Sequence, residues 1–247
     1  MPRNWKTYSE RAFNGRTTCN LKYGGQNKAE LMKGYTKPFA IILLVLLADQ
    51  VLKFWIKLNM SLGQEFHVLG HWFIIHFTEN NGMAFGVEFG GEAGKLALSL
   101  IRILAVSGIG YGLVHLIKHK YHRGLIINVS LIFAGALGNI IDSTFYGKIF
   151  SESNYFVKAQ LFPEVGGYAG LLHGKVVDML YFPLIETHYP SWFPFWANQP
   201  FVFFQPIFNL ADTAISIGVI GILVYQKRYF KEKPLEESQP QSEMTEE

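Results

Sequence analysis

Charged residues are scarce in this chain, and so are cysteines. Of its 247 residues, 17% are Asp, Glu, Lys or Arg, whereas 49% are hydrophobic. Soluble domains carry about a quarter charged residues, so the composition excludes an ordinary soluble enzyme and a disordered chain and indicates a membrane protein. The single cysteine, Cys19, excludes an intramolecular disulfide and a cysteine-based metal site. The net charge of +3, without a basic stripe among aromatics, gives no indication of nucleic-acid binding.

Four segments are apolar and long enough to cross about 30 Å of hydrocarbon. We expect membrane spans at 38–58, 96–117, 124–141 and 205–225. The first span does not have the form of a cleaved signal peptide, because a polar stretch precedes it and no small-residue cleavage site follows.

The basic residues predict the orientation of these spans. Eight of the 22 Lys and Arg residues precede Pro38, three lie within 118–123 and four within 227–233. The two long loops, 59–95 and 143–204, together hold only four. The positive-inside rule therefore predicts cytoplasmic termini, a cytoplasmic short loop and two long loops on the outer side.

Three regions follow from this topology. We expect 1–37 to be a polar cytoplasmic extension, 38–226 a four-helix membrane domain and 227–247 a disordered cytoplasmic tail. Because Met32 resembles a natural start, we expect residues 1–31 to be an upstream extension or a wrongly assigned start. An intact mass that includes them would refute this expectation.

The two outer loops carry different signals. Branched and aromatic runs at 65–69 and 72–77, split by Gly70 and His71, predict a β-hairpin. The end of the second loop is rich in proline and aromatic residues. Such a segment is typical of an anchor at the lipid surface. A lid or a groove for an apolar substrate is the alternative.

The chain has only four aspartates, and all are expected near the outer ends of the spans. Asp49 and Asp212 fall within spans, Asp142 closes the third span, and Asp178 precedes an apolar stretch. A carboxylate inside a span costs about 2.5–3.5 kcal/mol and therefore faces a cavity or a partner. Asp49 has Lys53 one helical turn away, which favours structural support. Asp178 and Asp212 have no basic residue at that spacing.

Two carboxyl groups in one poorly solvated site favour sharing a single proton, so that one is an acid while the other is a base. Such a pair can activate a water and later protonate the leaving amine of an amide. Other catalytic arrangements are absent from the sequence, which has no His-Glu-x-x-His and no Gly-x-Ser-x-Gly motif. We expect no metal and no cofactor.

Five pieces of the sequence, in order along the spans, resemble motifs of bacterial lipoprotein signal peptidases, the type II signal peptidases. They are 49–53 (Asp-Gln-Val-Leu-Lys), 79–86 (Glu-Asn-Asn-Gly-Met-Ala-Phe-Gly), 135–142 (Gly-Ala-Leu-Gly-Asn-Ile-Ile-Asp), 176–178 (Val-Val-Asp) and 208–212 (Phe-Asn-Leu-Ala-Asp). The resemblance covers the membrane part of the chain, about 38–225.

The resemblance implies an α-helical inner-membrane protein with four transmembrane helices, an outer β-structured cradle and aspartic endopeptidase activity. The implied catalytic pair is Asp178 and Asp212. The implied substrate is a prolipoprotein whose lipobox cysteine already carries diacylglycerol, bound in contact with membrane lipid. The positions implied to support the site or contact substrate are Asp49, Lys53, Asn80, Gly82, Asn139, Asp142 and Asn209. Hydrogen bonding between helices is the alternative for the asparagines.

Two departures from the family accompany this resemblance. Ser143 stands where the family usually has an arginine, whose task would fall to Lys148 or Lys175 or be absent. The segment 143–175 is also longer than the usual connection of about ten residues that the resemblance implies. We expect an added lid there, with Gly166, Gly167 and Gly170 as flexible points.

Two further functions fit parts of the sequence. A proton-coupled transporter or channel subunit could use intramembrane carboxylates as a relay. The absence of an inverted repeat and the clustering of the aspartates at one end argue against it. A non-enzymatic assembly factor would keep its cellular function after both Asp178 and Asp212 were replaced by asparagine.

Overall fold

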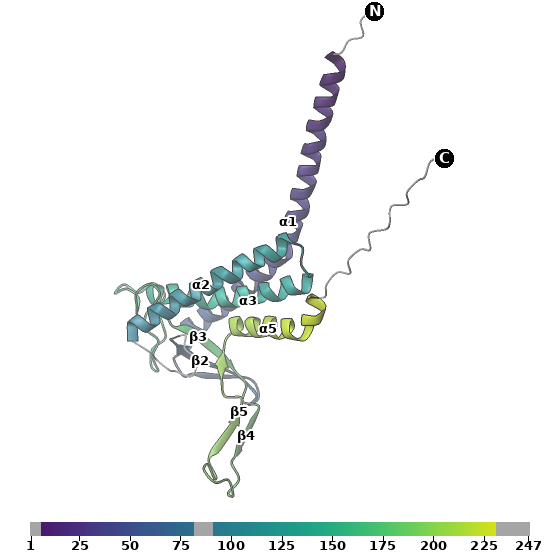
Figure 1. Cartoon of the computed structure of the whole chain (residues 1–247). Coiled ribbons are helices and arrows are strands. Elements are labelled where there is room, and N and C mark those ends of the chain that lie inside the picture. Colours follow the sequence, from purple (N-terminus) through teal and green to yellow (C-terminus); the bar gives the residue numbers. More distant parts are fainter. Residues whose placement is uncertain (1–5, 82–90, 231–247) are drawn as a thin grey trace, which may run out of the picture.

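The computed structural model of the protein describes residues 6–81 and 91–230, with side chains from residue 32 onward except at 92 and 186. The helices are α1 (Lys6–Asn59), α2 (Gly91–Lys118), α3 (Arg123–Ile141), the π-helical turn η2 (Asp142–Tyr146), α4 (Gly147–Ile149) and α5 (Leu210–Tyr229). The strands are β1 (Glu65–Leu69), β2 (Phe73–Asn80), β3 (Val176–Tyr181), β4 (Ile185–His188), β5 (Pro200–Phe203) and β6 (Ile207–Phe208). Figure 1 shows α2, α3 and α5 running together with the second half of α1, whose N-terminal part leaves the bundle.

Four helical segments of the described chain are long and apolar enough to cross a membrane. They are Met32–Asn59, Ala93–Lys118, Arg123–Ile149 and Leu210–Tyr229. The prediction of four spans is confirmed, but two predicted boundaries are wrong.

The third span does not end at Ile141. Its helix continues through η2 and α4 to Ile149. The polar residues there fit inside the fold because their side chains find partners. The Ser143 hydroxyl donates to the Asn139 carbonyl oxygen at 3.0 Å, and Asp142 is fully buried against Lys53. Paired polar groups need no exit to water, so the helix does not stop at them.

The fourth span begins at Leu210 rather than at residue 205. The residues before it contain β6, which pairs with β3, and Asn209 caps the helix. Asp212 therefore lies in the first turn of α5, not one or two turns inside a span. A strand and a cap residue start the helix here, although the apolar composition of 205–209 resembles that of the span.

Close contacts between helices depend on small residues of α3. A Cβ atom added at Gly135 would lie 2.2 Å from the Ala211 carbonyl oxygen of α5. One added at Gly138 would lie 2.9 Å from Asp49 Oδ2 of α1. Such positions let helix backbones approach closely in a membrane, where packing and hydrogen bonds replace the hydrophobic effect between helices. The polar ends of α1, α3 and α5 consequently meet.

A four-stranded antiparallel sheet, in the order β1-β2-β3-β6, lies at one end of the bundle. The predicted hairpin is confirmed by the pairing of β1 with β2. The pairing of β2 with β3 places Thr78 opposite Asp178 and Asn80 opposite Val176. This register places the end of β2 beside the start of β3, and both lie next to the start of α5. We call the sheet together with residues 142–175 the cradle.

The long segment 143–175 packs against α1 and forms part of the cradle. Tyr146 and Phe150 are fully buried in the same core as Ile56 of α1. A Cβ atom at Gly167 would lie 2.2 Å from the Gly147 carbonyl oxygen. The expectation that Gly167 is a flexible point is therefore wrong, because this glycine allows two backbones to touch. Gly166 has a φ of +89°, a conformation that favours glycine.

The contact of α3 with α5 gives a first testable prediction. We expect Gly135→Ala to destabilise the protein by about 1–3 kcal/mol, because the new methyl group overpacks against Ala211. Gly108→Ala in α2 is the matched control, since nothing lies within 4 Å of the added atom; it should be neutral or stabilise by up to about 1 kcal/mol. Thermal unfolding in detergent measures both, and a Gly135→Ala protein as stable as the Gly108→Ala protein would contradict the packing.

Candidate active site

A buried ammonium group joins two of the four aspartates. Lys53 Nζ lies 2.9 Å from Asp49 Oδ2 and 2.7 Å from Asp142 Oδ2, and all three side chains are at most 1% exposed. The second oxygen of Asp49 accepts the backbone N–H of Ala211 at 3.0 Å. The cluster therefore ties α1 to the end of α3 and to the first turn of α5.

Asn139 connects this cluster to the carboxyl group of Asp212. Its side-chain oxygen accepts from Lys53 Nζ at 2.9 Å, and its side-chain nitrogen donates to Asp212 Oδ1 at 2.8 Å. The lysine therefore fixes which way the amide faces. The amide in turn presents a donor to Asp212.

Asn209 bridges Asp178 and Asp212. Its Nδ2 donates to Asp178 Oδ1 at 2.7 Å, while its Oδ1 accepts the Asp212 backbone N–H at 2.9 Å. Asp212 completes a capping box at the start of α5. The positive end of the helix dipole favours a negative charge there. The backbone N–H of Asn209 donates to Asp212 Oδ2 at 3.4 Å, so one fully buried asparagine contacts both carboxyl groups.

Asp178 lies in β3 and is 3% exposed. Asn80, at the end of β2, donates a short hydrogen bond to its second oxygen, Oδ2. Burial, and then the charge of Asp212, raises the pKa of Asp178 to about 7, although the two asparagine donors and Lys53 act in the opposite direction. The carboxyl group can therefore hold a proton near neutral pH.

A second buried ion pair fixes the strand that carries Asn80. Lys57, on α1, contacts Glu79 closely, and both side chains are at most 3% exposed. Ser153, from the inserted segment, donates to the same Glu79 oxygen at 2.8 Å. Because Glu79 precedes Asn80 in β2, this network holds the strand end against α1.

The structure brings together eight of the nine site residues implied by the sequence. Three asparagines contact the two candidate catalytic carboxyl groups directly. Asp49 and Asp142 lie behind them and contact Lys53, and Lys53 contacts Asn139. The salt bridge from Asp49 to Lys53 confirms the pairing expected from their spacing. Gly82 lies outside the described residues.

Two polar residues that complete this network, Gln50 and Tyr146, were not predicted from the sequence. Gln50 donates to Asp142 Oδ1 at 2.9 Å and to Asp49 Oδ2 at 3.1 Å. The hydroxyl of Tyr146 donates to the side-chain oxygen of Gln50 at 3.1 Å. An amide beside an aspartate within an apolar span is the signal that could have identified Gln50, because such a group needs a buried partner.

The basic residues expected to stand in for the family arginine are used elsewhere. Lys175 pairs with Glu79 at 3.8 Å and with Glu152 at 3.6 Å, and Lys148 is exposed. Arg102, a half-buried cation inside α2, instead interacts electrostatically with Asp212 and Asp178.

The face of α2 that carries Arg102 points towards the cradle. Ser99 donates to the Leu172 carbonyl oxygen at 2.9 Å, and Lys95 donates to the side-chain oxygen of Asn81 at 2.9 Å. Residues 95, 99 and 102 share one helical face by their spacing. A buried or half-buried cation within a span was the available signal for Arg102.

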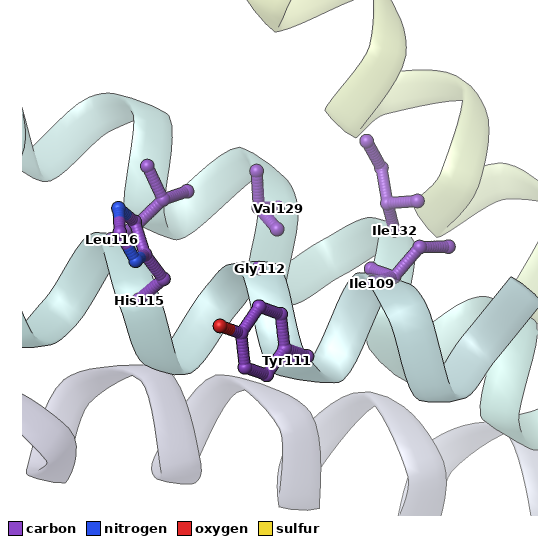
Figure 2. Close-up of a pocket in the computed structure, with 7 residues that line it drawn as sticks. All are labelled: Ile109, Tyr111, Gly112, His115, Leu116, Val129 and Ile132. Atoms are coloured by element: carbon purple, nitrogen blue, oxygen red, sulfur yellow. The ribbon is translucent and has the colours of Figure 1, made fainter.

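The bundle also has an apolar groove that contains no carboxyl group. It has a volume of about 590 Å³ and opens between α2 and α3, as Figure 2 shows. Its lining consists of Ile109, Tyr111, Gly112, His115, Leu116, Val129 and Ile132. No carboxylate is among these residues, so the groove is separate from the aspartate cluster. In the described part of the chain, no group of three His, Cys, Asp or Glu residues has the geometry of a metal site.

Fold and site together define a multi-pass membrane protein in which Asn209 bridges the buried Asp178 and the half-buried Asp212 at one end of the bundle. A family model for signal peptidase II (SPase II) matches residues 41–227. A lipoprotein signal peptidase of Porphyromonas gingivalis is 54% identical over 190 residues, or 76% of this chain and 82% of that protein. One from Amoebophilus asiaticus is 39% identical over 209 residues, or 83% of this chain and 84% of that protein.

Among solved structures, a bacterial membrane enzyme is similar with a TM-score of 0.50 and 28% identity, over 81% of this chain and 93% of that one. The chain belongs to the signal peptidase II family, and it is accordingly a membrane protease. The transporter alternative is not supported.

The Lys53 cluster gives a second testable prediction. We expect Lys53→Met to destabilise the protein by about 3–5 kcal/mol, because it leaves Asp49 and Asp142 buried without a counter-charge. Lys148→Met, at an exposed position, should change stability by less than about 0.5 kcal/mol. Thermal unfolding in detergent compares the two variants, and equal melting temperatures would contradict a central role for Lys53.

Proposed function

We propose that the protein removes signal peptides from prolipoproteins by aspartic hydrolysis, with Asp178 and Asp212 as the catalytic pair. Membership of the signal peptidase II family supports the reaction class. The observation that carries the residue assignment is the bridge through Asn209, whose side chain and backbone N–H hydrogen-bond the carboxyl groups of Asp178 and Asp212 respectively.

In this mechanism Asp178 holds the shared proton and Asp212 is the anion. The raised pKa of Asp178 supports the first role, and the position of Asp212 at the N-terminus of α5 supports the second. Asp212 takes a proton from water as the water oxygen attacks the scissile carbonyl carbon, while Asp178 hydrogen-bonds the carbonyl oxygen. The carbon–nitrogen bond then breaks, and the departing amine takes a proton from the pair.

The proposed substrate carries diacylglycerol on the cysteine that follows the scissile bond. The apolar signal peptide would lie among the helices, and the scissile bond at the level where α5 begins. We further propose an inner-membrane location with cytoplasmic termini and the cradle on the periplasmic side. The distribution of Lys and Arg supports this orientation, because 15 of the 22 lie in the termini and the short loop between α2 and α3.

Arg102 is proposed to take over the electrostatic task of the arginine that Ser143 replaces. It acts on the two carboxyl groups electrostatically from α2, whereas position 143 follows α3. A cation beside the pair stabilises its anionic form, so that one aspartate is ionised at neutral pH although both are close together. Arg102 is thus a positioning residue for charge.

Neutral isosteres test the catalytic pair. We expect Asp178→Asn and Asp212→Asn each to lower cleavage of a diacylglyceryl-modified precursor by more than about 10³-fold, since each removes one partner in proton transfer. Glu164→Gln, at an exposed carboxylate, should leave cleavage unchanged. Gel shift of purified protein with modified and unmodified precursor measures both activity and lipid dependence; normal processing by either aspartate variant would refute the assignment.

Replacing Asp178 by asparagine should also change how the stability of the protein depends on pH. The pKa of Asp178 is raised, so its protonated form stabilises the native state below the ordinary aspartate pKa, and that stability is lost as the pH rises through about 7. Asparagine does not titrate. The melting temperature of Asp178→Asn relative to the original protein should therefore increase between about pH 5 and about pH 8. A difference independent of pH would contradict the raised pKa.

The pH profile of cleavage tests Arg102. We expect Arg102→Gln to shift both limbs of the profile to higher pH, because removing the positive charge raises the apparent pKa values of the carboxyl pair. Arg102→Lys keeps the charge and should restore the original profile in part. A variant that only folds less well would lose activity evenly across the pH range, and that outcome would exclude an electrostatic role.

A further inference from the structure

Residues 184–204 form an extension that contains none of the candidate site residues, and we call it the aromatic arm. Within it β4 pairs antiparallel with β5, from Ile185 opposite Phe203 to His188 opposite Pro200. Figure 1 shows both strands projecting away from the bundle, across the direction of α2, α3 and α5. The aromatic arm therefore extends sideways rather than along the axis of the bundle.

The root of the arm is fixed beside the start of a membrane-spanning helix. The ring of Phe182 stacks on Phe73 of β2 at 4.8 Å and on Phe208 of β6 at 5.8 Å. Two residues after Phe208 the span α5 begins at Leu210. The root consequently lies where α5 leaves the hydrocarbon region. An arm that runs sideways from this level follows the membrane surface.

The tip of the arm is ordered by contacts between its own aromatic rings. The Tyr189 ring lies 5.1 Å from the rings of Phe193 and Phe201. Backbone hydrogen bonds join Tyr189 to Gln199 at 2.9 Å and to Asn198 at 3.0 Å. This arrangement holds the loop between the two strands in one conformation.

Other large aromatic side chains of the tip are exposed. Trp192 is 76% exposed, Phe195 is 79% exposed and Trp196 is 50% exposed. In water such a group of rings would be an aggregation hazard. Side chains with an apolar body and a polar edge, as in tryptophan, prefer the interface between headgroups and acyl chains.

The charge of the segment also matches that environment. Between Asp178 and Asp212 the sequence holds one charged residue, Glu186, and no lysine or arginine. A surface made for an acidic or basic protein partner would carry complementary charge. A nearly uncharged aromatic surface instead favours insertion into the lipid interface, driven by burial of apolar area.

We propose that the aromatic arm lies in the interface of the membrane leaflet on the cradle side and inserts Trp192, Phe195 and Trp196 among the lipids. Of the two alternatives that the sequence left open for this loop, it is thus the anchor rather than the lid. The arm adds a lateral contact with the bilayer to the four spans. It holds the cradle at a fixed depth, and the inference does not depend on the proposed chemistry.

Depth-dependent quenching of tryptophan fluorescence tests the arm. The full chain is prepared with Trp192 as its only tryptophan, by replacing the other four with phenylalanine, and reconstituted into phosphatidylethanolamine and phosphatidylglycerol vesicles. We expect a blue-shifted emission, strong quenching by lipids brominated on the upper acyl carbons and weak quenching by aqueous iodide.

The matched control places a single tryptophan on the cradle of a chain in which all five tryptophans of the original sequence, Trp192 included, are replaced by phenylalanine. Val165→Trp is suitable because Val165 is fully exposed in the inserted segment. Its emission should be open to iodide and insensitive to brominated lipid. A second comparison uses the otherwise original chain, in which Trp192→Phe with Trp196→Phe should remove part of the lipid-quenched emission and leave that of Trp55, which is 50% exposed within the first span.

Three outcomes would overturn the proposal. Iodide-accessible emission of Trp192 without lipid quenching would place the arm in water. Protection that arises only when a lipidated precursor is added would assign the arm to substrate binding. Protection that depends on protein concentration in detergent would assign it to contact between two copies of the chain.

Discussion

The ammonium group of Lys53 is shared by the carboxylates of Asp49 and Asp142, and all three are shut away from water. Removing such charges from solvent costs several kcal/mol for each ion, so the arrangement persists only where the partners are close and their remaining lone pairs are used. Here Gln50, the Ala211 backbone and Asn139 take up those remaining positions. The cluster thereby fixes the relative positions of three helices that the lipid by itself would not order.

The proposed catalytic carboxyl groups are approached from this cluster on one side and from the sheet on the other. The helix side supplies Asn139, and the first turn of α5 supplies Asn209 and Asp212. The sheet side supplies Asp178 from β3 and Asn80 from β2. The ion pair of Lys57 with Glu79 holds β2 in place. Rigid elements on both sides suit hydrolysis, because an acid and a base act together only when their separation is fixed. The asparagines supply this rigidity without adding charge.

Much of this arrangement could be predicted from the sequence, because the free energy of placing a segment or a charged side chain in lipid depends on local composition. Long apolar segments predicted the four spans, and the cost of a carboxylate in lipid directed attention to the few aspartates. The salt bridge of Asp49 with Lys53 followed from their spacing on one helix. The exact start of α5 did not follow, because Phe208 and Leu210 are both apolar, and the pairing of β6 with β3 and the cap at Asn209 separate them.

Longer-range geometry was likewise out of reach of the sequence. The π-helical turn at Asp142 depends on partners from α1, which are 89 and 92 residues away. The role of Gly167 depends on the backbone of Gly147 passing within contact distance. Arg102 was visible as an unusual charge in a span, but its direction towards Asp212 required the packing of α2.

The inserted segment shows that chain length within a family is a poor guide to what can be removed. Ser153 lies in the part that the family resemblance marks as extra, yet it shares its hydrogen bonds with Lys57 and Glu79. Tyr168, from the same part, faces the ammonium groups of both Lys57 and Lys175. A version of this chain trimmed to the shorter connection would expose two buried ions along with the apolar core around Phe150. Without the inserted segment, the ion pair of Lys57 and Glu79 would lose the hydroxyl group that completes its hydrogen bonding.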